Sequence, residues 1–425
     1  MPQSVLPFKL EITHERITSH AGLAVFGEFL KALGLSALVD RKLPAPGSEA
    51  GYLPSRYVEP LILMLHGGGG CLEDLRQIRQ DAGLRDVLGM RELPSSDAVG
   101  DWLRRMGAGD GLKGLAGVAA RMVRRALNRD EATDYTLDID ATQIVAEKAE
   151  AKWTYKGERG YMPIVGHLAE NGLVIGDEFR EGNQSPGAGN LDFIRYCAGQ
   201  MPRGKRIGRL RSDSAAYQAS IINWCEEEGV EFAIGADMDS AVKNVIAMIA
   251  EEDWQPYEDG QIAETVHSMN TTRNAFRLVV VRRPCQTELF GQECLRYKVI
   301  ASNRTETAAE TMAWYNRRGD ASENRIKELK IGFAMERLPC GDFGANAMFF
   351  RIGVLAYNVF VLFKLLALPA EWRHCQVQTV RWRLYQLAGK VVAHGRRTIL
   401  KVSSWAWGIL EEIRTRAREV ALTPA

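Results

Sequence analysis

The segment from about residue 133 to 239 constrains the fold most strongly, because strand-like and helix-like patterns alternate along it. TLDIDAT (136–142) has the period of two of a strand, and YMPIVGHLAENGLVIGDEF (161–179) reads as a hairpin that turns at 170–172. Two helix–strand repeats follow: LDFIRYCAGQ with KRIGRLRSD, then AAYQASIINWCEEEG with VEFAIGAD. This interleaving predicts an α/β fold whose mixed sheet contains at least one parallel pair.

The flanking segments have helical periodicity. Residues 20–130 are expected to be mostly helical, with the glycine run 67–70 ending a helix or making a turn. Residues 345–425 are also expected to be helical, with Trp405 and Trp407 in the core. The apolar run 347–368 approaches the length of a membrane span. Arg351, Asn358 and Lys364 interrupt it, which favours a buried helix.

These patterns divide the chain into five parts. We expect a helical N-terminal region (1–130), a first core part (131–239), a β-rich insertion (240–296), a second core part (297–345) and a helical basic C-terminal region (346–425). The insertion is polar and has one clear strand, AFRLVVVRR, and LRYKVIAS then resumes the core.

Composition restricts the partners and the compartment. The net charge of +1 shows no overall nucleic-acid footprint, but the last 55 residues carry ten Lys and Arg against four Glu. Seven cysteines without a CxxC pair indicate neither a zinc knuckle nor a redox motif and favour a reducing compartment. The first twenty residues are charged and have no apolar leader, so we expect a cytoplasmic protein.

Two aspartates lie on the strand TLDIDAT. The strand period puts Asp138 and Asp140 on one face, although aspartate is depleted in strands. They either face water at a sheet edge or provide a metal ligand on a rigid strand.

A third aspartate, Asp213, ends the strand in KRIGRLRSDSAAY, where a helix begins. It is either a helix N-cap or a second ligand. The basic residues before it form either a solvated edge or a phosphate-contacting surface. They are Arg203, Lys205, Arg206, Arg209 and Arg211.

The stretch YNRRGDASENRIKELK (315–330) adds a glutamate among basic residues. Asp320 and Glu323 have the spacing of a capping box, and paired charges on a surface helix explain the rest equally well.

Taken together, three carboxylates can converge at one edge of a mixed sheet. Carboxylate oxygens suit Mg²⁺ or Mn²⁺ and not zinc. Two such ions about 4 Å apart can activate water and stabilise the leaving oxygen of a phosphodiester. The neighbouring Arg and Lys residues would supply the positive charge that phosphoryl transfer needs.

At this point the residues resemble a known family. LDIDAT, the hairpin segment, RLRSDSAAY and the sequence Tyr315…Arg318…Glu323…Lys330 resemble a DDE transposase of a bacterial insertion sequence. The resemblance is to the cut-and-paste group with a ribonuclease H-like core, a β-strand insertion and a Y-R-E-K signature. It spans roughly residues 95–400.

The resemblance implies specific residue roles. Asp140, Asp213 and Glu323 would bind the metal, with Asp138 as the alternate first ligand. Tyr315, Arg318 and Lys330 would hold the DNA backbone near the cleaved end, and the N-terminal region (1–130) would bind the DNA ends. Arg209 and Arg211, from the basic cluster before Asp213, are also expected to contact DNA. Tyr297, or alternatively Trp254, would take the place of a base-stacking Trp. The gap between Arg318 and Glu323 is one residue longer than is usual in the family.

The predicted function is therefore a Mg²⁺-dependent transposase that uses two ions. It would cleave and join double-stranded DNA at terminal inverted repeats, act as a homodimer on the two ends, associate with the bacterial nucleoid and have no membrane partner. The alternatives are a ribonuclease H-like nuclease without transposition and a catalytically silent DNA-binding relative.

Overall fold

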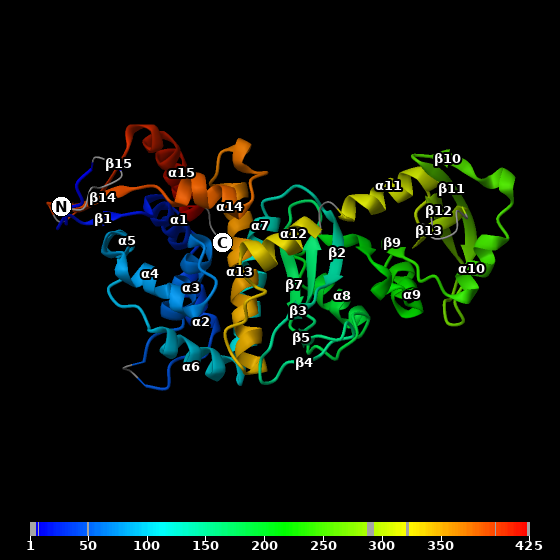
Figure 1. Ribbon diagram of the computed structural model, residues 1–425, viewed down its shortest axis with the longest axis horizontal. Coiled ribbons are helices and arrows are strands. Elements are labelled where there is room, and N and C mark those ends of the chain that lie inside the picture. Colours follow the sequence, from blue (N-terminus) through cyan, green and yellow to red (C-terminus); the bar gives the residue numbers. More distant parts are fainter. Residues whose placement is uncertain are drawn as a thin grey trace.

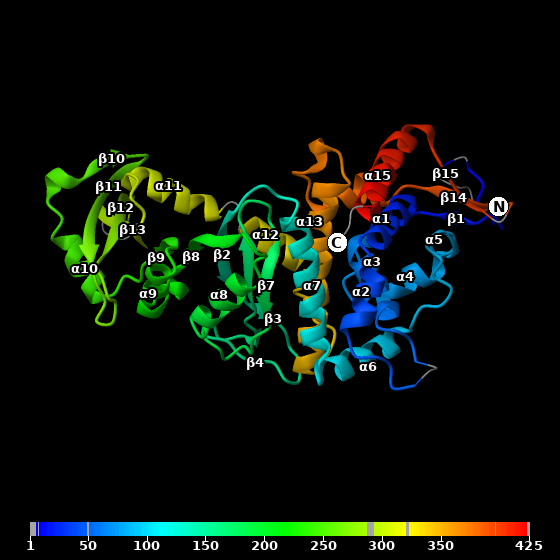
Figure 2. The same cartoon turned by 180° about the vertical axis from the view of Figure 1, so that it is seen from behind.

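The protein is an elongated molecule with three regions along its length, and the structure analysed is a computed structural model (Figure 1). It describes residues 6, 8–48, 51–286, 293–319, 323–395 and 397–422. The N-terminal helices and the C-terminal segments form one end of the molecule. The strands of the first core part (131–239) lie in the middle, and the strands of the insertion form the other end (Figures 1 and 2).

One nine-stranded sheet links the central region to the insertion, in the order β10-β11-β12-β13-β9-β8-β2-β6-β7. In the central part, β2 is parallel to β8, β8 is parallel to β9, and β2 is antiparallel to β6. The predicted mixed sheet with a parallel pair is confirmed. Its central strands are β2 (Asp134–Ala141), β6 (Ile164–Leu168), β7 (Val174–Glu178), β8 (Arg206–Ser212) and β9 (Glu231–Gly235). The helices α8 (Asn190–Gly199) and α9 (Ala219–Glu227) connect them.

The insertion continues this sheet instead of building a separate one. It contains more regular structure than its single predicted strand: α10 (Ser240–Ala247), β10 (Gln255–Tyr257), β11 (Gly260–His267) and β12 (Phe276–Gln286). β13 (Glu293–Ser302) pairs with β12 along its length and with β9 at its end, where Ile300 lies opposite Gly235. The strand predicted to resume the core therefore joins the two parts.

The described part of the N-terminal region contains seven α-helices. Helix α3 ends at Gly67, and Gly68 takes a left-handed backbone (φ 106°), so the glycine run ends a helix as predicted. The helices are α1 (Ala21–Ala32), α2 (Leu35–Lys42), α3 (Ser55–Gly67), α4 (Leu75–Gln80), α5 (Ala82–Leu88), α6 (Ser96–Gly107) and α7 (Gly111–Leu127).

The C-terminal region departs from the prediction in two ways. It is helical in α13 (Phe343–Leu366), α14 (Val377–Val380) and α15 (Ser404–Leu422). However, β14 (Gly389–His394) and β15 (Arg397–Val402) form a hairpin that pairs with β1 (Ile17–Thr18). The expectation that Trp405 and Trp407 lie in the core is also wrong: they are 72% and 62% exposed, because α15 buries its other face, with Ala406, Leu410 and Ile413.

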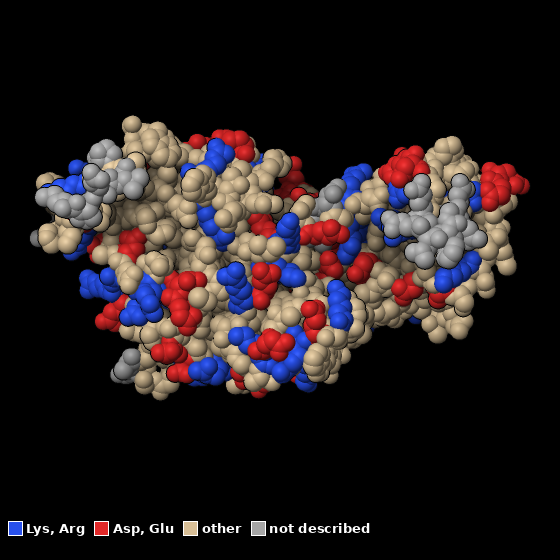
Figure 3. Space-filling model, viewed as in Figure 1, with Lys and Arg blue, Asp and Glu red and all other residues tan. Residues whose placement is uncertain are grey.

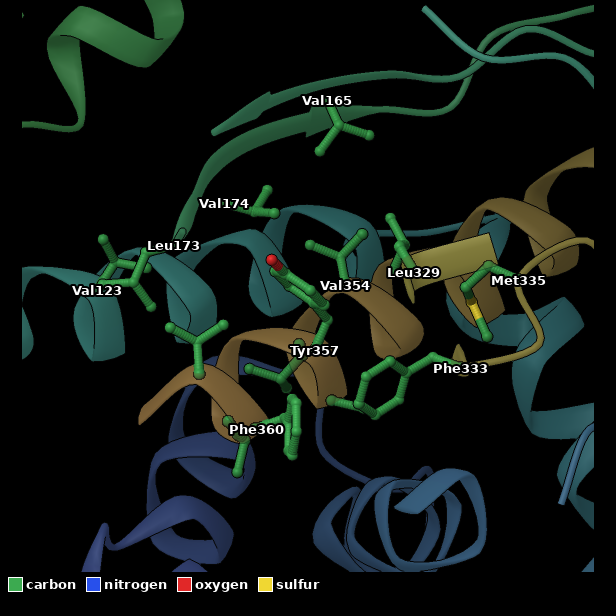
Figure 4. Close-up of a cluster of buried hydrophobic side chains, with 14 of the residues drawn as sticks. Val123, Val165, Leu173, Val174, Leu329, Phe333, Met335, Val354, Tyr357 and Phe360 are labelled. Carbon is green, nitrogen blue, oxygen red and sulfur yellow. The ribbon is translucent and has the colours of Figure 1, made fainter. Parts of the chain in front are cut away.

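Helix α13 forms the centre of the core, as predicted for the apolar run 347–368. Its Val354, Tyr357 and Phe360 pack with Val174 of the sheet and Phe333 (Figure 4). The polar side chains inside the run have protein partners. The Asn358 side chain accepts a hydrogen bond from the Val174 N–H and donates one to the Val174 carbonyl. Arg351 donates to the Asp177 carboxylate at 2.8 Å. Although α13 is long and apolar enough to cross a membrane, 78% of its most apolar window is buried inside the protein.

Candidate active site

The parallel strands β2 and β8 bring two of the predicted acids to the same edge. Their register pairs Ile139 of β2 with Ser212, the last residue of β8. Asp140 and Asp213 directly follow these two paired residues. Neighbouring strands lie about 4.8 Å apart, and residues in register face the same side of the sheet. The strand pairing therefore brings together two carboxylates that are far apart in the sequence.

Asp140 is only 20% exposed and lies among charges of both signs. Burial is the largest influence and raises its pKa to about 6; Arg318 lowers the pKa, while Asp213, Glu323 and Asp138 raise it. The net result is a carboxyl group that holds its proton more strongly than usual. A cation at this point would favour the ionised form.

Asp138, the alternate first ligand, has a different partner. Its carboxylate is completely buried and accepts two hydrogen bonds from Arg211, at 2.7 and 2.8 Å. Arg211 also donates to the Trp314 carbonyl and lies 5.0 Å above the Trp314 ring. This pair fastens β2 and β8 to α11 (Ala308–Arg318). Between the two candidates for first ligand, the geometry favours Asp140, and Arg211 has no exposed donor to offer a phosphate.

Asp213 is a capping residue as well as a neighbour of Asp140. Its Oδ1 accepts a hydrogen bond from the Ala215 N–H at 3.2 Å, at the start of a short 3₁₀ turn over Ser214–Ala216. The two interpretations from the sequence are therefore compatible, since one carboxylate oxygen caps the turn and the other stays available.

Glu323 directly precedes a short helix. Helix α11 ends at Arg318, and α12 (Asn324–Lys327) begins directly after Glu323, whose side chain is exposed. Three of the four residues between Arg318 and Glu323 lie outside the described residues, so the structure does not account for the longer spacing. The expected capping box depends on Asp320, which lies outside the described residues.

Two signature residues of α11 lie against the strand ends. Arg318 is buried, donates to the Ile139 carbonyl at 3.2 Å and lies 3.6 Å from the Asp140 carboxylate. Tyr315 is half-buried; burial raises its pKa, and Asp213 and Asp140 raise it further. The Tyr315 hydroxyl lies beside Gly235, where an added Cβ would meet it at 3.0 Å.

Lys330, the last signature residue, lies on the segment after Glu323. Its Nζ donates to the Gln143 carbonyl at 2.8 Å, just beyond the end of β2. Sequence reasoning missed two further arginines that dock the same segment. Arg325 donates to the carbonyls of Leu168 and Ala169, and the buried Arg381 donates to the Gly332 carbonyl. The sequence provided only a weak indication of these two contacts: Arg325 is a positive charge close to Glu323, and Arg381 is a positive charge among apolar residues.

The two candidates for the base-stacking aromatic are neighbours. The rings of Tyr297 and Trp254 lie 6.5 Å apart, and Arg282 stacks on Trp254 at 4.1 Å. Trp254 is buried whereas Tyr297 is half-buried, so Tyr297 is the more accessible ring. Sequence reasoning also missed Lys298, which lies 5.3 Å from the Tyr315 ring.

Arg209 lies away from the strand ends that carry Asp140 and Asp213. It donates to the Thr136 hydroxyl at 3.0 Å and pairs with Glu170 at 3.3 Å, with a third of its side chain exposed. On the face shown in Figure 3, Lys and Arg are interspersed with Asp and Glu instead of forming a single basic field. Single phosphate contacts at individual Lys and Arg side chains therefore suit this face better than one continuous DNA-binding surface.

The donor chemistry of the site fits a hard divalent cation. Asp140, Asp213 and Glu323 contribute only carboxylates, and each of the other two raises the pKa of Asp140. Among the described residues, no three His, Cys, Asp or Glu side chains are close enough to hold an ion without further movement. Ion binding would therefore have to draw the exposed Glu323 toward the two aspartates.

The strand order β7-β6-β2-β8-β9, in which β6 is antiparallel and β8 parallel to β2, fits a ribonuclease H-like fold. The family model described as transposase DDE domain, group 1, matches residues 4–418. The chain therefore belongs to this family of DDE transposases, and the predicted fold class is confirmed. A comparison with curated proteins finds no significant match.

Proposed function

We propose that this transposase cleaves DNA at the terminal inverted repeats of an insertion sequence and joins the freed ends to target DNA. Its family membership supports a role in DNA cleavage and transposition. The observation that carries the finer proposal is the electrostatic coupling of Asp140 to Asp213 and Glu323 at one edge of the sheet.

In this proposal, Asp140, Asp213 and Glu323 hold Mg²⁺ or Mn²⁺, and two ions are required. Bound ions of this kind activate the attacking oxygen and stabilise the leaving oxygen of a phosphodiester. Asp140 must lose its proton to become a ligand, and Arg318 at 3.6 Å favours that ionised form.

The neighbouring side chains position the DNA backbone. Tyr315, Arg318 and Lys330 surround the strand ends, so they can orient a phosphate there. Lys298 adds a positive charge beside Tyr315, whereas Tyr297, the proposed stacking ring, lies on the opposite face of β13. Arg209 would contact DNA farther from the cleaved bond, whereas Arg211 would act indirectly by fixing Asp138.

The further parts of the proposal concern partners and location. A homodimer would hold both transposon ends, the N-terminal helices would bind those ends, and the basic C-terminal region would contact phosphates. The enzyme would work in the cytoplasm on nucleoid DNA.

The test incubates labelled inverted-repeat DNA and target DNA with the wild type and with Glu323→Gln in Mg²⁺. We expect nicking and strand transfer by the wild type and a loss of at least about a hundredfold in the variant. Equal cleavage by both proteins would contradict the triad. Cleavage without strand transfer would favour a nuclease, and binding without cleavage would favour a silent relative.

Glu328→Gln is a matched control for the same experiment. Glu328 lies five residues after Glu323, but its carboxylate accepts a hydrogen bond from the Val377 N–H at 2.7 Å, in contact with another part of the protein. The control should keep its cleavage rate within a few-fold of the wild type.

A further inference from the structure

Three arginines line a hollow between helix α7 and the connection from α8 to β8. Helix α7 lies between the other N-terminal helices and the central strands (Figures 1 and 2). Arg121, Arg124 and Asn128 are spaced three and four residues apart, so they lie on one face of α7. The hollow has a volume of about 370 Å³. Its lining residues are Arg121, Arg124, Asn128, Met201, Pro202 and Arg203, and none of them is acidic.

The guanidinium groups in the hollow have no acidic partner within the chain. Among the described residues, no ion pair includes Arg121, Arg124 or Arg203. Helix α7 brings further positive charge to the same place: burial lowers the pKa of Arg125, and the neighbouring Arg129 and Arg121 lower it further. The arginines therefore repel one another, and an anion in the hollow would offset this repulsion.

Hydrogen bonds fix the two walls of the hollow relative to each other. The Arg124 Nε donates to the Gln200 carbonyl at 2.9 Å, which fastens α7 to the end of α8. The Lys205 ammonium, two residues after Arg203, donates to the Asp130 carbonyl at 2.6 Å, beyond the end of α7. The positive charges are thus held in place in advance, which reduces the cost of ordering them around a ligand.

The hollow lies at the sheet edge opposite the candidate active site. The connections that follow α7 and Arg203 lead to the start of β2 and β8, where Asp134 lies opposite Arg206. Asp140 lies six residues farther along β2, a distance of about 20 Å. A group bound in the hollow is therefore too far from the three acids to take part in bond cleavage directly.

The lining favours a phosphate group over a base. Guanidinium groups bind phosphate oxygens through paired N–H donors. Met201 and Pro202 are the apolar residues among the described lining, which offers no aromatic ring on which a base could stack. Arg121 and Arg203 are exposed, so the hollow is accessible to a large partner. Since the chain belongs to a family of DNA transposases, the backbone of DNA is the phosphate source that agrees with these observations.

We propose that Arg121, Arg124 and Arg203 bind a backbone phosphate of double-stranded DNA at least about 20 Å from the cleaved bond, whatever the base sequence. At 3.4 Å per base pair, this separation corresponds to about six base pairs or more. Phosphate contacts position a duplex without reading its sequence. A second point of attachment there fixes the direction in which the duplex approaches the three acids. The inference rests on the proposed function only in taking DNA as the substrate.

The salt dependence of binding tests the phosphate contact. The full-length protein is titrated with a labelled duplex that lacks the inverted repeats, at several salt concentrations. Arg121→Gln/Arg203→Gln removes two positive charges from the hollow. The slope of log affinity against log salt should therefore become shallower by about two, and the affinity near 0.1 M salt should fall at least about tenfold.

Arg195→Gln/Arg206→Gln is the matched control, because it causes the same change in net charge. Both arginines are exposed and already pair with Asp192 and Asp134. The control should keep the wild-type slope, and circular dichroism checks that each variant is folded. Equal slopes in the wild type and Arg121→Gln/Arg203→Gln, or equal reductions in both double variants, would overturn the proposal.

Cross-linking locates the contact along the DNA. Chains with a photoreactive benzophenone side chain at position 203 are irradiated on end-labelled inverted-repeat DNA. Cross-links are expected at least about six base pairs from the cleaved bond, whereas the same probe at position 298, beside Tyr315, should cross-link next to that bond. Cross-links from position 203 next to the cleaved bond, or to protein instead of DNA, would overturn the proposal. A wild type that fails to cleave would contradict the proposed function and leave the salt slopes unchanged.

Discussion

The Arg318 guanidinium lies 3.6 Å from the Asp140 carboxylate, although the two residues are 178 positions apart in the sequence. Arg318 is the nearest positive charge that offsets the burial of Asp140 and the repulsion from Asp213 and Glu323. A signature arginine therefore has a role before any DNA is bound, because it holds the proposed first ligand closer to its ionised form.

Replacing Arg318 should change the pH at which the site binds cations. Arg318→Met removes the influence that lowers the pKa of Asp140, so this pKa should rise above about 6. Ion binding requires the carboxylate, and protons would then compete with the ion closer to neutral pH. We expect Mn²⁺ affinity, measured by calorimetry, to fall more steeply on acidification than in the wild type.

Arg318→Lys and Arg317→Met are the matched variants for that measurement. The first keeps the positive charge, and the second removes an adjacent exposed one. Both should retain a pH profile close to that of the wild type. An unchanged profile in Arg318→Met would show that Arg318 does not control Asp140.

Asp140→Asn should stabilise the metal-free protein at neutral pH. The folded-state pKa of Asp140 is about 6, above its ordinary value of 3.8. Folding therefore favours the protonated form, and the native state loses stability as pH rises from about 4 to about 6. This difference corresponds to at most about 3 kcal/mol.

Urea unfolding in the presence of a chelator measures this effect. Asp140→Asn should be more stable than the wild type above about pH 6, and the difference should vanish near pH 4. Asp134→Asn, at an exposed pair with Arg206, is the control and should show no such trend. A destabilised Asp140→Asn at neutral pH would contradict the assignment.

The buried pair of Asp138 and Arg211 should be important for stability. Arg211→Met leaves the fully buried Asp138 carboxylate without its partner, which typically costs about 3–5 kcal/mol. The double variant Asp138→Leu/Arg211→Met should unfold at higher urea than Arg211→Met alone, because no charge is then stranded. Arg206→Met at the exposed pair should cost less than about 1 kcal/mol. Equal costs for Arg211→Met and Arg206→Met would refute this role.

Local patterns allowed the strand ends to be predicted from the sequence. Asp140 and Asp213 each follow a short alternating run, and neighbouring parallel strands must end at one edge. The Asp138–Arg211 contact could not be predicted, because it joins residues 73 positions apart and depends on strand register. The sequence favoured Asp140 as the first ligand and kept Asp138 as the alternate; the buried Asp138–Arg211 pair agrees with that choice.

The β14–β15 hairpin had a local signal that the helical interpretation overlooked. Val391, Val392 and Ile399 are β-branched, and Gly395 has a left-handed backbone (φ 55°) that suits the turn between the strands. Basic residues along the same stretch favoured the interpretation as a DNA-binding helical tail. The insertion was underestimated because β10 and β11 are rich in polar residues; β10 is the edge strand, and β11 pairs with β12 along its whole length.

Gly235→Ala should disturb the position of Tyr315 and slow DNA cleavage. An added Cβ would meet the Tyr315 hydroxyl at 3.0 Å and the Ser214 backbone nitrogen at 3.1 Å. Since Ser214 follows Asp213 directly, the substitution forces α11 or the 3₁₀ turn to shift by tenths of an ångström. Small misplacements in active sites are costly, so we expect a loss of about tenfold or more in cleavage of labelled inverted-repeat DNA.

Two matched variants locate the cause of that loss. Gly199→Ala, at a glycine with no atom within 4 Å of an added Cβ, should cleave at the wild-type rate. Gly235→Ala/Tyr315→Phe removes the oxygen that the new methyl group would meet, so it should cleave faster than Gly235→Ala if crowding at the hydroxyl is the cause. A double variant slower than both single variants would mean that the Tyr315 hydroxyl itself contacts the DNA.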